Sequence, residues 1–180
     1  MKKVVIASIV GGLLLFIWQT LSWTVLELHS PMQSYTPKQD EILKFLNENL
    51  DEGNYFLPTV PAGTSMEESD KAMTAAAGKP WADIRFHKAM NMQQNMGMNM
   101  IRGFLIDIIA VFLLCWFLLK NTSDFKTTLL SCVALGLISY LTTDYTFQIW
   151  YETKTIPNLI DAIAGWGLCG IWLGWWLSRK

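Results

Sequence analysis

The chain has 180 residues, of which 52% are hydrophobic and 16% are charged, and its formal net charge is −1. Nine tryptophans and a mean hydropathy of +0.27 make it too apolar for an ordinary soluble domain. The near-zero charge also argues against a nucleic-acid-binding surface. These values indicate an integral membrane protein in direct contact with membrane lipids.

Four segments are apolar enough to cross a bilayer, whose hydrocarbon core of about 30 Å needs roughly 20 helical residues. The predicted spans are residues 4–25, 101–119, 127–143 and 156–177. Lys2 and Lys3 before the first span are also typical of a secretory signal, but WQTLSWTVLELH offers no small-residue cleavage site. We therefore interpret the first span as a retained anchor.

The basic residues predict how the chain is threaded through the membrane. Most of the basic residues near the termini and the short connections would lie on one side of the membrane: Lys2, Lys3, Lys120, Lys126, Arg179 and Lys180. Because cytoplasmic loops are enriched in Lys and Arg, both termini are expected in the cytoplasm. Residues 1–25 then form the first transmembrane helix, 26–100 an extracytoplasmic α+β domain running into the second helix, and 101–180 the remaining three. The expected fold is mainly α, a four-helix transmembrane bundle with a small α+β insertion between the first and second spans.

The insertion carries signals for two helices and two strands. Thr36 and Pro37 open a helical pattern over residues 37–50, and the spacing of Ser65 and Glu68 predicts a capping box before a second helix. Residues 54–57 and the alternating segment WADIRFH are expected to pair as a two-stranded ribbon.

Three stretches of the sequence carry a resemblance. They are IWQTLSWTVLELH at the end of the first span, GNYFLP in the insertion, and MNMIRGFLIDII opening the second span. With this pattern the chain resembles an uncharacterised family of small four-span bacterial inner-membrane proteins. The resemblance implies a multi-pass protein of the bacterial inner membrane, and it implies no activity or site residues.

A methionine-rich stretch precedes the second span. Its candidate metal ligands are His87, Met90, Met92, Met96, Met98 and Met100. Thioethers select soft ions, so one hypothesis is an extracytoplasmic Cu(I) site. The other is packing: in an unbroken helix over residues 88–120, Met92, Met96, Met100, Gly103 and Asp107 would form one interhelical stripe.

Two aspartates lie within or near the spans, where a carboxylate is costly and functional by default. In one interpretation Asp107 pairs with Arg102 or a hydroxyl, and Asp161 caps its helix or reaches the interface. In the other, a cation or proton enters between the second and fourth helices. A conducting path would then need polar groups that continue toward the cytoplasm. The available ones are Gln19, Ser22, Ser131, Ser139 and Thr142, and none of them is ionisable.

Small residues in the spans suggest close helix contacts. Gly167, Gly170 and Gly174 lie on one face of the fourth helix and are predicted to serve a partner interface. The three cysteines, Cys115, Cys132 and Cys169, fall inside spans without CxxC spacing and are expected to pack as small apolar residues.

No enzyme signature is present, and the two histidines, His29 and His87, are too few for a heme-copper or di-iron centre. The favoured hypothesis is therefore a non-catalytic accessory or scaffolding subunit of a larger bacterial inner-membrane assembly, such as a respiratory one, with other membrane subunits as partners and without a cofactor. Copper handling and transport of a small cation or proton are the two alternatives.

Overall fold

The computed structural model describes residues 2–120 and 124–179 and divides into two units. The first contains the chain up to Ser34 and from Gln94 onward, and the second is Tyr35–Gln93. The described residues are mainly helical, with one small sheet.

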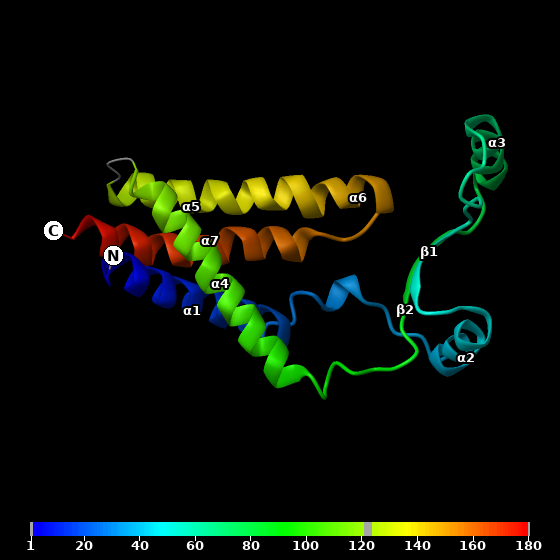
Figure 1. The fold of residues 1–180 in the computed structure, drawn as a ribbon, viewed down its shortest axis with the longest axis horizontal. Coiled ribbons are helices and arrows are strands. Elements are labelled where there is room, and N and C mark those ends of the chain that lie inside the picture. The colour runs from blue at the N-terminus through cyan, green and yellow to red at the C-terminus, as the bar shows by residue number, and fades with distance from the viewer. Residues whose placement is uncertain (1, 121–123, 180) are drawn as a thin grey trace. The chain divides into compact units, whose positions relative to one another are not determined.

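Four helices of the first unit are long and apolar enough to cross a membrane (Figure 1). They are α1 (Lys2–Thr24), α4 (Met96–Leu118), the continuous run α5 (Phe125–Tyr140), η2 (Leu141–Tyr145) and α6 (Thr146–Tyr151), and α7 (Ile156–Ser178). These are the spans that a multi-pass membrane protein needs, in the order the hydropathy predicts.

Two predicted boundaries are wrong. The second helix does not begin at residue 88; it begins at Met96, after a turn, because asparagine at residues 91 and 95 favours turns and helix ends over helix interiors. The third span extends beyond the predicted residue 143 to Tyr151, since no proline interrupts it, and a π-helical turn carries the chain onward. At its start, the backbone N–H of Thr127 donates to Asp124 at 2.7 Å and lowers the pKa of that carboxyl.

The close contacts between the spans join α4 to α1, α1 to α7, and α7 to α5. At the α1–α4 contact, a Cβ on Gly12 would lie 2.8 Å from the backbone nitrogen of Ile108, so only glycine allows this approach. The indole of Trp176 donates to the carbonyl of Lys3 at 2.9 Å, which places the start of α1 beside the end of α7.

A buried apolar core fills the half of the first unit that is nearer the termini. Its members are Ala7, Leu15, Val111, Leu114, Cys115, Leu118, Cys132, Cys169 and Leu173. The three cysteines are free and buried there, which confirms that they pack as apolar side chains. This core closes the interior between the spans at that end.

The glycine face of α7 requires a correction. Gly170 and Gly174 are buried within the chain, where a Cβ would lie 2.9 Å from Cys132 and from Phe125 of α5. The predicted partner interface therefore fails at these two glycines, because their small size serves the α5–α7 contact. Gly167 is half-buried, and a Cβ there would meet Val133 only at 4.0 Å.

The second unit has the predicted helices and ribbon. It contains α2 (Gln39–Asn49), β1 (Gly53–Leu57), α3 (Met66–Ala76) and β2 (Ala82–Phe86). The strands pair antiparallel with Tyr55 opposite Ile84, and Phe86 is buried as the alternation predicts. Ser65 caps α3 as expected, since its hydroxyl oxygen accepts from the backbone N–H of Glu68; the hydroxyl also donates to the Glu68 carboxylate, in place of the backbone contact of a full capping box.

The Lys88 ammonium closes one end of the ribbon by binding the carboxylate of Asp51 at 2.7 Å. This contact lowers the pKa of Asp51 and raises that of Lys88. Both groups are open to solvent, so the pair contributes little to stability.

Candidate functional site

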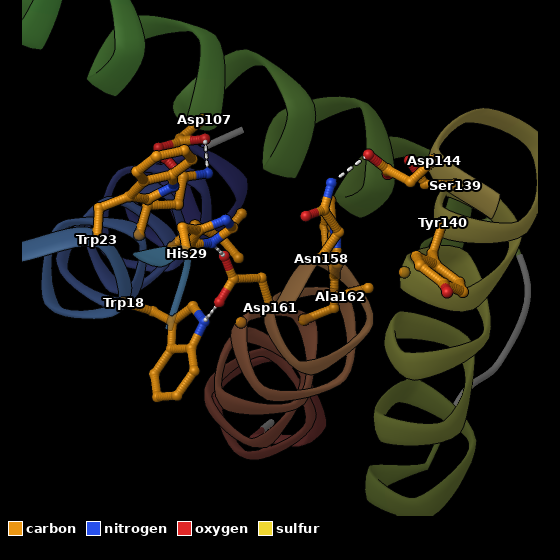
Figure 2. Close-up of a pocket in the computed structure, with 15 residues that line it drawn as sticks. Trp18, Trp23, His29, Asp107, Ser139, Tyr140, Asp144, Asn158, Asp161 and Ala162 are labelled. Atoms are coloured by element: carbon orange, nitrogen blue, oxygen red, sulfur yellow. Dashed lines mark hydrogen bonds and ion pairs between the residues drawn. The ribbon is translucent and has the colours of Figure 1, made fainter. Parts of the chain in front are cut away.

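A partly open cavity of about 370 Å³ lies between the spans of the first unit, on the side of the core away from the termini (Figure 2). Its ionisable or amide-bearing lining residues come from α1, the loop after it, α4, η2 and α7, and they are Gln19, His29, Asp107, Asp144, Asn158 and Asp161. Its aromatic lining residues are Trp18, Trp23, Tyr140 and Trp166. Segments far apart in the sequence thus converge on one polar space.

Asp161 lies on the second turn of α7 and accepts hydrogen bonds from three different side chains. The hydroxyl of Ser22 donates at 2.6 Å and the indole of Trp18 at 3.0 Å, both to Oδ1. The ring nitrogen Nε2 of His29 lies 2.8 Å from Oδ2. Both carboxylate oxygens are therefore partnered, and Asp161 joins α7 to α1 and to the loop that follows it.

His29 reaches Asp161 because the loop after α1 folds back over the end of the bundle. The indole of Trp23 stacks on the imidazole with a ring separation of 3.8 Å and an interplanar angle of 4°. The other ring nitrogen, Nδ1, lies 3.3 Å from the sulfur of Met32. His29 is only 5% exposed. Because both nitrogens face acceptors, a protonated His29 could donate at both positions.

Asp107 lies in the middle of α4, roughly 16 Å along the helix from Met96 at 1.5 Å per residue. It is 7% exposed, and its Oδ1 accepts a hydrogen bond from the amide of Gln19 at 3.2 Å. Its Oδ2 is buried without a hydrogen-bond partner among the described residues. A carboxylate oxygen in that position leaves room for a donor from outside the chain.

Asp144 and Asn158 form the third polar group of the cavity, where η2 faces the start of α7 (Figure 2). The amide nitrogen of Asn158 donates to Asp144, whose other oxygen accepts from Thr143 at 3.1 Å. The amide oxygen of Asn158 is buried and, like Oδ2 of Asp107, has no partner in the described part of the chain. The cavity therefore contains two unsatisfied acceptors.

The charge balance of the cavity is negative. Three aspartates and one histidine line it, and none of its described lining residues is Lys or Arg. A positive charge on His29 would neutralise only one of the three carboxylates. Low-dielectric walls strengthen the field of such a cluster, so the cavity attracts positive charge.

The structure brings the two sequence-predicted aspartates into one cavity but changes their partners. Asp107 does not pair with Arg102, which is exposed, because five residues of helix separate them by about 140° around the axis. It bonds instead to the amide of Gln19. Asp161 is held by three donors of the first span and its loop and does not simply cap its helix.

His29 was not among the predicted site residues. The sequence indicated only that two histidines are too few for a heme-copper or di-iron centre. The available signal was the position of a histidine just beyond the end of the first span, at the level of Asp161. Of the polar residues proposed to extend a path, Gln19 and Ser139 line the cavity and Ser22 binds Asp161.

The methionine-rich stretch is solvent-accessible along its whole length. All five sulfur-bearing side chains are exposed: Met90, Met92, Met96, Met98 and Met100. The predicted packing stripe is wrong within the described chain for its three methionines, since Met92 precedes α4 and Met96 and Met100 lie exposed on it. His87, Met90 and Met92 belong to the second unit and the remaining three to the first, so the Cu(I) site stays a prediction.

Comparison with family models, curated proteins and solved structures gave no match to this chain. The chemistry of the cavity is therefore the basis on which a function can be argued.

Proposed function

We propose that this protein is a small multi-pass membrane transporter that binds a cation in the acidic cavity as the first step of transport. The observation that carries the proposal is Asp107, a carboxylate in the middle of a span with one oxygen that is buried and has no partner within the part of the chain that the structure describes. A charged group at that depth costs several kcal/mol unless it is compensated, and natural proteins keep such groups where they serve a ligand or ion.

The position of the cavity fits a site that is open on one side. The apolar core around Val111, Cys115 and Cys169 lies between the cavity and the ends of the chain. A cation arriving from the cavity side would meet three carboxylates and then an apolar barrier. Transport would require a second arrangement in which this barrier opens, as alternating-access proteins do.

We place the protein in a bacterial inner membrane, with both termini in the cytoplasm and the second unit outside. The distribution of Lys and Arg supports this orientation, as does the resemblance to small four-span inner-membrane proteins. The cavity, formed where α1 ends and α7 begins, would then face the extracytoplasmic side.

Thermal unfolding of the purified protein in mild detergent tests the proposal. At constant ionic strength, a panel of inorganic and organic cations should contain at least one that raises the melting temperature in a saturable way, since a ligand that binds only the folded state stabilises it. Asp107→Asn should abolish that increase. Asp83→Asn, which removes an exposed carboxylate of the second unit, should retain it.

The accessory-subunit hypothesis remains an alternative without a specific structural feature in its favour. It does not account for a carboxylate in the middle of a span whose Oδ2 is buried without a partner among the described residues, and two of the three glycines on which it relied are used within the chain. If no cation of the panel raises the melting temperature of the wild-type protein, the accessory-subunit hypothesis would become the favoured one.

A further inference from the structure

We propose that the ligand of the cavity is a small organic ammonium ion that retains N–H donors, a primary or secondary amine in its protonated form. This inference rests on the proposed function and specifies its substrate class. Its grounds are the unsatisfied acceptors, the aromatic lining and the size of the cavity.

The unsatisfied acceptors of the cavity favour a ligand with N–H donors. Two buried atoms of the cavity have no partner among the described residues, Oδ2 of Asp107 and the amide oxygen of Asn158, and both are acceptors. Buried acceptors are normally satisfied, and leaving one unpaired costs about 1–3 kcal/mol. A primary ammonium brings three N–H donors and a positive charge, so it supplies what these atoms lack. A quaternary ammonium brings the charge without any donor.

The aromatic lining of the cavity favours an organic cation. Four aromatic side chains line the same space as the carboxylates: Trp18, Trp23, Tyr140 and Trp166. Aromatic faces attract organic cations through their quadrupoles and also accommodate the apolar body of the ligand. A volume of about 370 Å³ lies at the small end of the range of ligand pockets, which is roughly 300–1,000 Å³.

The lining is poorly suited to divalent and transition-metal cations. Ca²⁺ takes six to eight oxygen ligands and Mg²⁺ requires near-ideal octahedral geometry. Both oxygens of Asp161 are already occupied by Trp18, Ser22 and His29. Transition metals prefer imidazole or thiolate groups, and the described lining has one histidine and no cysteine.

The test is a titration of the full-length protein in detergent, followed by tryptophan fluorescence, because three tryptophans line the cavity. The probes are n-butylammonium, tetramethylammonium and sodium chlorides at constant pH and ionic strength. We expect a saturable change with n-butylammonium, and apparent affinity at least about tenfold weaker for tetramethylammonium, as the loss of charge-assisted hydrogen bonds implies. Asp107→Asn should abolish the saturable change with n-butylammonium, and Asp83→Asn should leave it unchanged.

Other results would overturn the inference in distinguishable ways. Saturable, Asp107-dependent binding of sodium without binding of n-butylammonium would contradict the ammonium inference and leave the proposed function standing. Equal affinity for tetramethylammonium and n-butylammonium would contradict recognition through N–H donors. The absence of saturation with every probe, or equal affinity in wild type and Asp107→Asn, would contradict both. The comparison of probes on the wild-type protein needs no variant, so a poorly folded variant cannot obscure it.

Discussion

At the scale of single residues, the aspartates of the cavity differ in how fully their oxygens are partnered. Within residues 2–120 and 124–179, Asp161 has three side-chain partners, whereas Asp107 has one, the amide of Gln19. A fully partnered carboxylate holds structure together, and a partly partnered one remains available to a ligand. We therefore assign Asp161 mainly to positioning and Asp107 to binding.

This assignment predicts opposite effects of two matched substitutions on the ligand-free protein. Asp107→Asn should raise the free energy of unfolding by about 1–3 kcal/mol, because it removes an uncompensated charge from a span. Asp161→Asn should lower it by about 2–3 kcal/mol, since donors of the first span and its loop lose a charged acceptor. Chemical unfolding in detergent measures both values. Equal losses in the two variants would contradict the division of roles.

At the scale of helices, the α1–α4 contact positions Gln19 against Asp107 and depends on the small size of Gly12. Gly12→Ala should cost about 1–3 kcal/mol of stability, because the new methyl group would meet the backbone of Ile108 and force the helices apart. Thermal unfolding in detergent checks this value. Gly97→Ala in α4 is the control: a Cβ there meets nothing within 4 Å, so stability should stay level or rise by up to about 1 kcal/mol. Equal melting temperatures for Gly12→Ala and wild type would argue against a close contact.

Hydropathy predicted the four long helices because a bilayer demands a fixed length of apolar residues. The ribbon was also predictable, because the alternation of apolar and polar residues in WADIRFH indicates a half-buried strand. Helix ends were harder to predict. The start of α4 at Met96 and the extension of the third span to Tyr151 depend on local backbone competition and on packing that periodicity does not encode.

At the scale of the whole molecule, the proposed orientation can be tested by cysteine labelling. The three natural cysteines are buried, so background labelling should be low. Thr74→Cys, in α3 of the second unit, should react with a membrane-impermeant maleimide in intact spheroplasts. A cysteine added after Lys180 should react only after permeabilisation. The reverse pattern would invert the topology and place the cavity on the cytoplasmic side.

The cavity itself was only partly predictable from the sequence. Asp107 and Asp161 could be identified because acidic residues in spans are rare and costly. The contact of His29 with Asp161 could not be predicted in the same way, because 132 positions separate the two residues and the sequence shows only that His29 lies just beyond the end of the first span. The free oxygen of Asp107 was likewise beyond prediction, because it depends on which neighbour reaches the other oxygen.

The central claim is that the cavity binds a cation through Asp107. Equilibrium dialysis of the purified protein against a radiolabelled cation that raises its melting temperature tests this claim most directly. We expect saturable binding of about one cation per chain by wild type and by Asp83→Asn, and loss of that binding in Asp107→Asn. Equal binding by wild type and Asp107→Asn would contradict it.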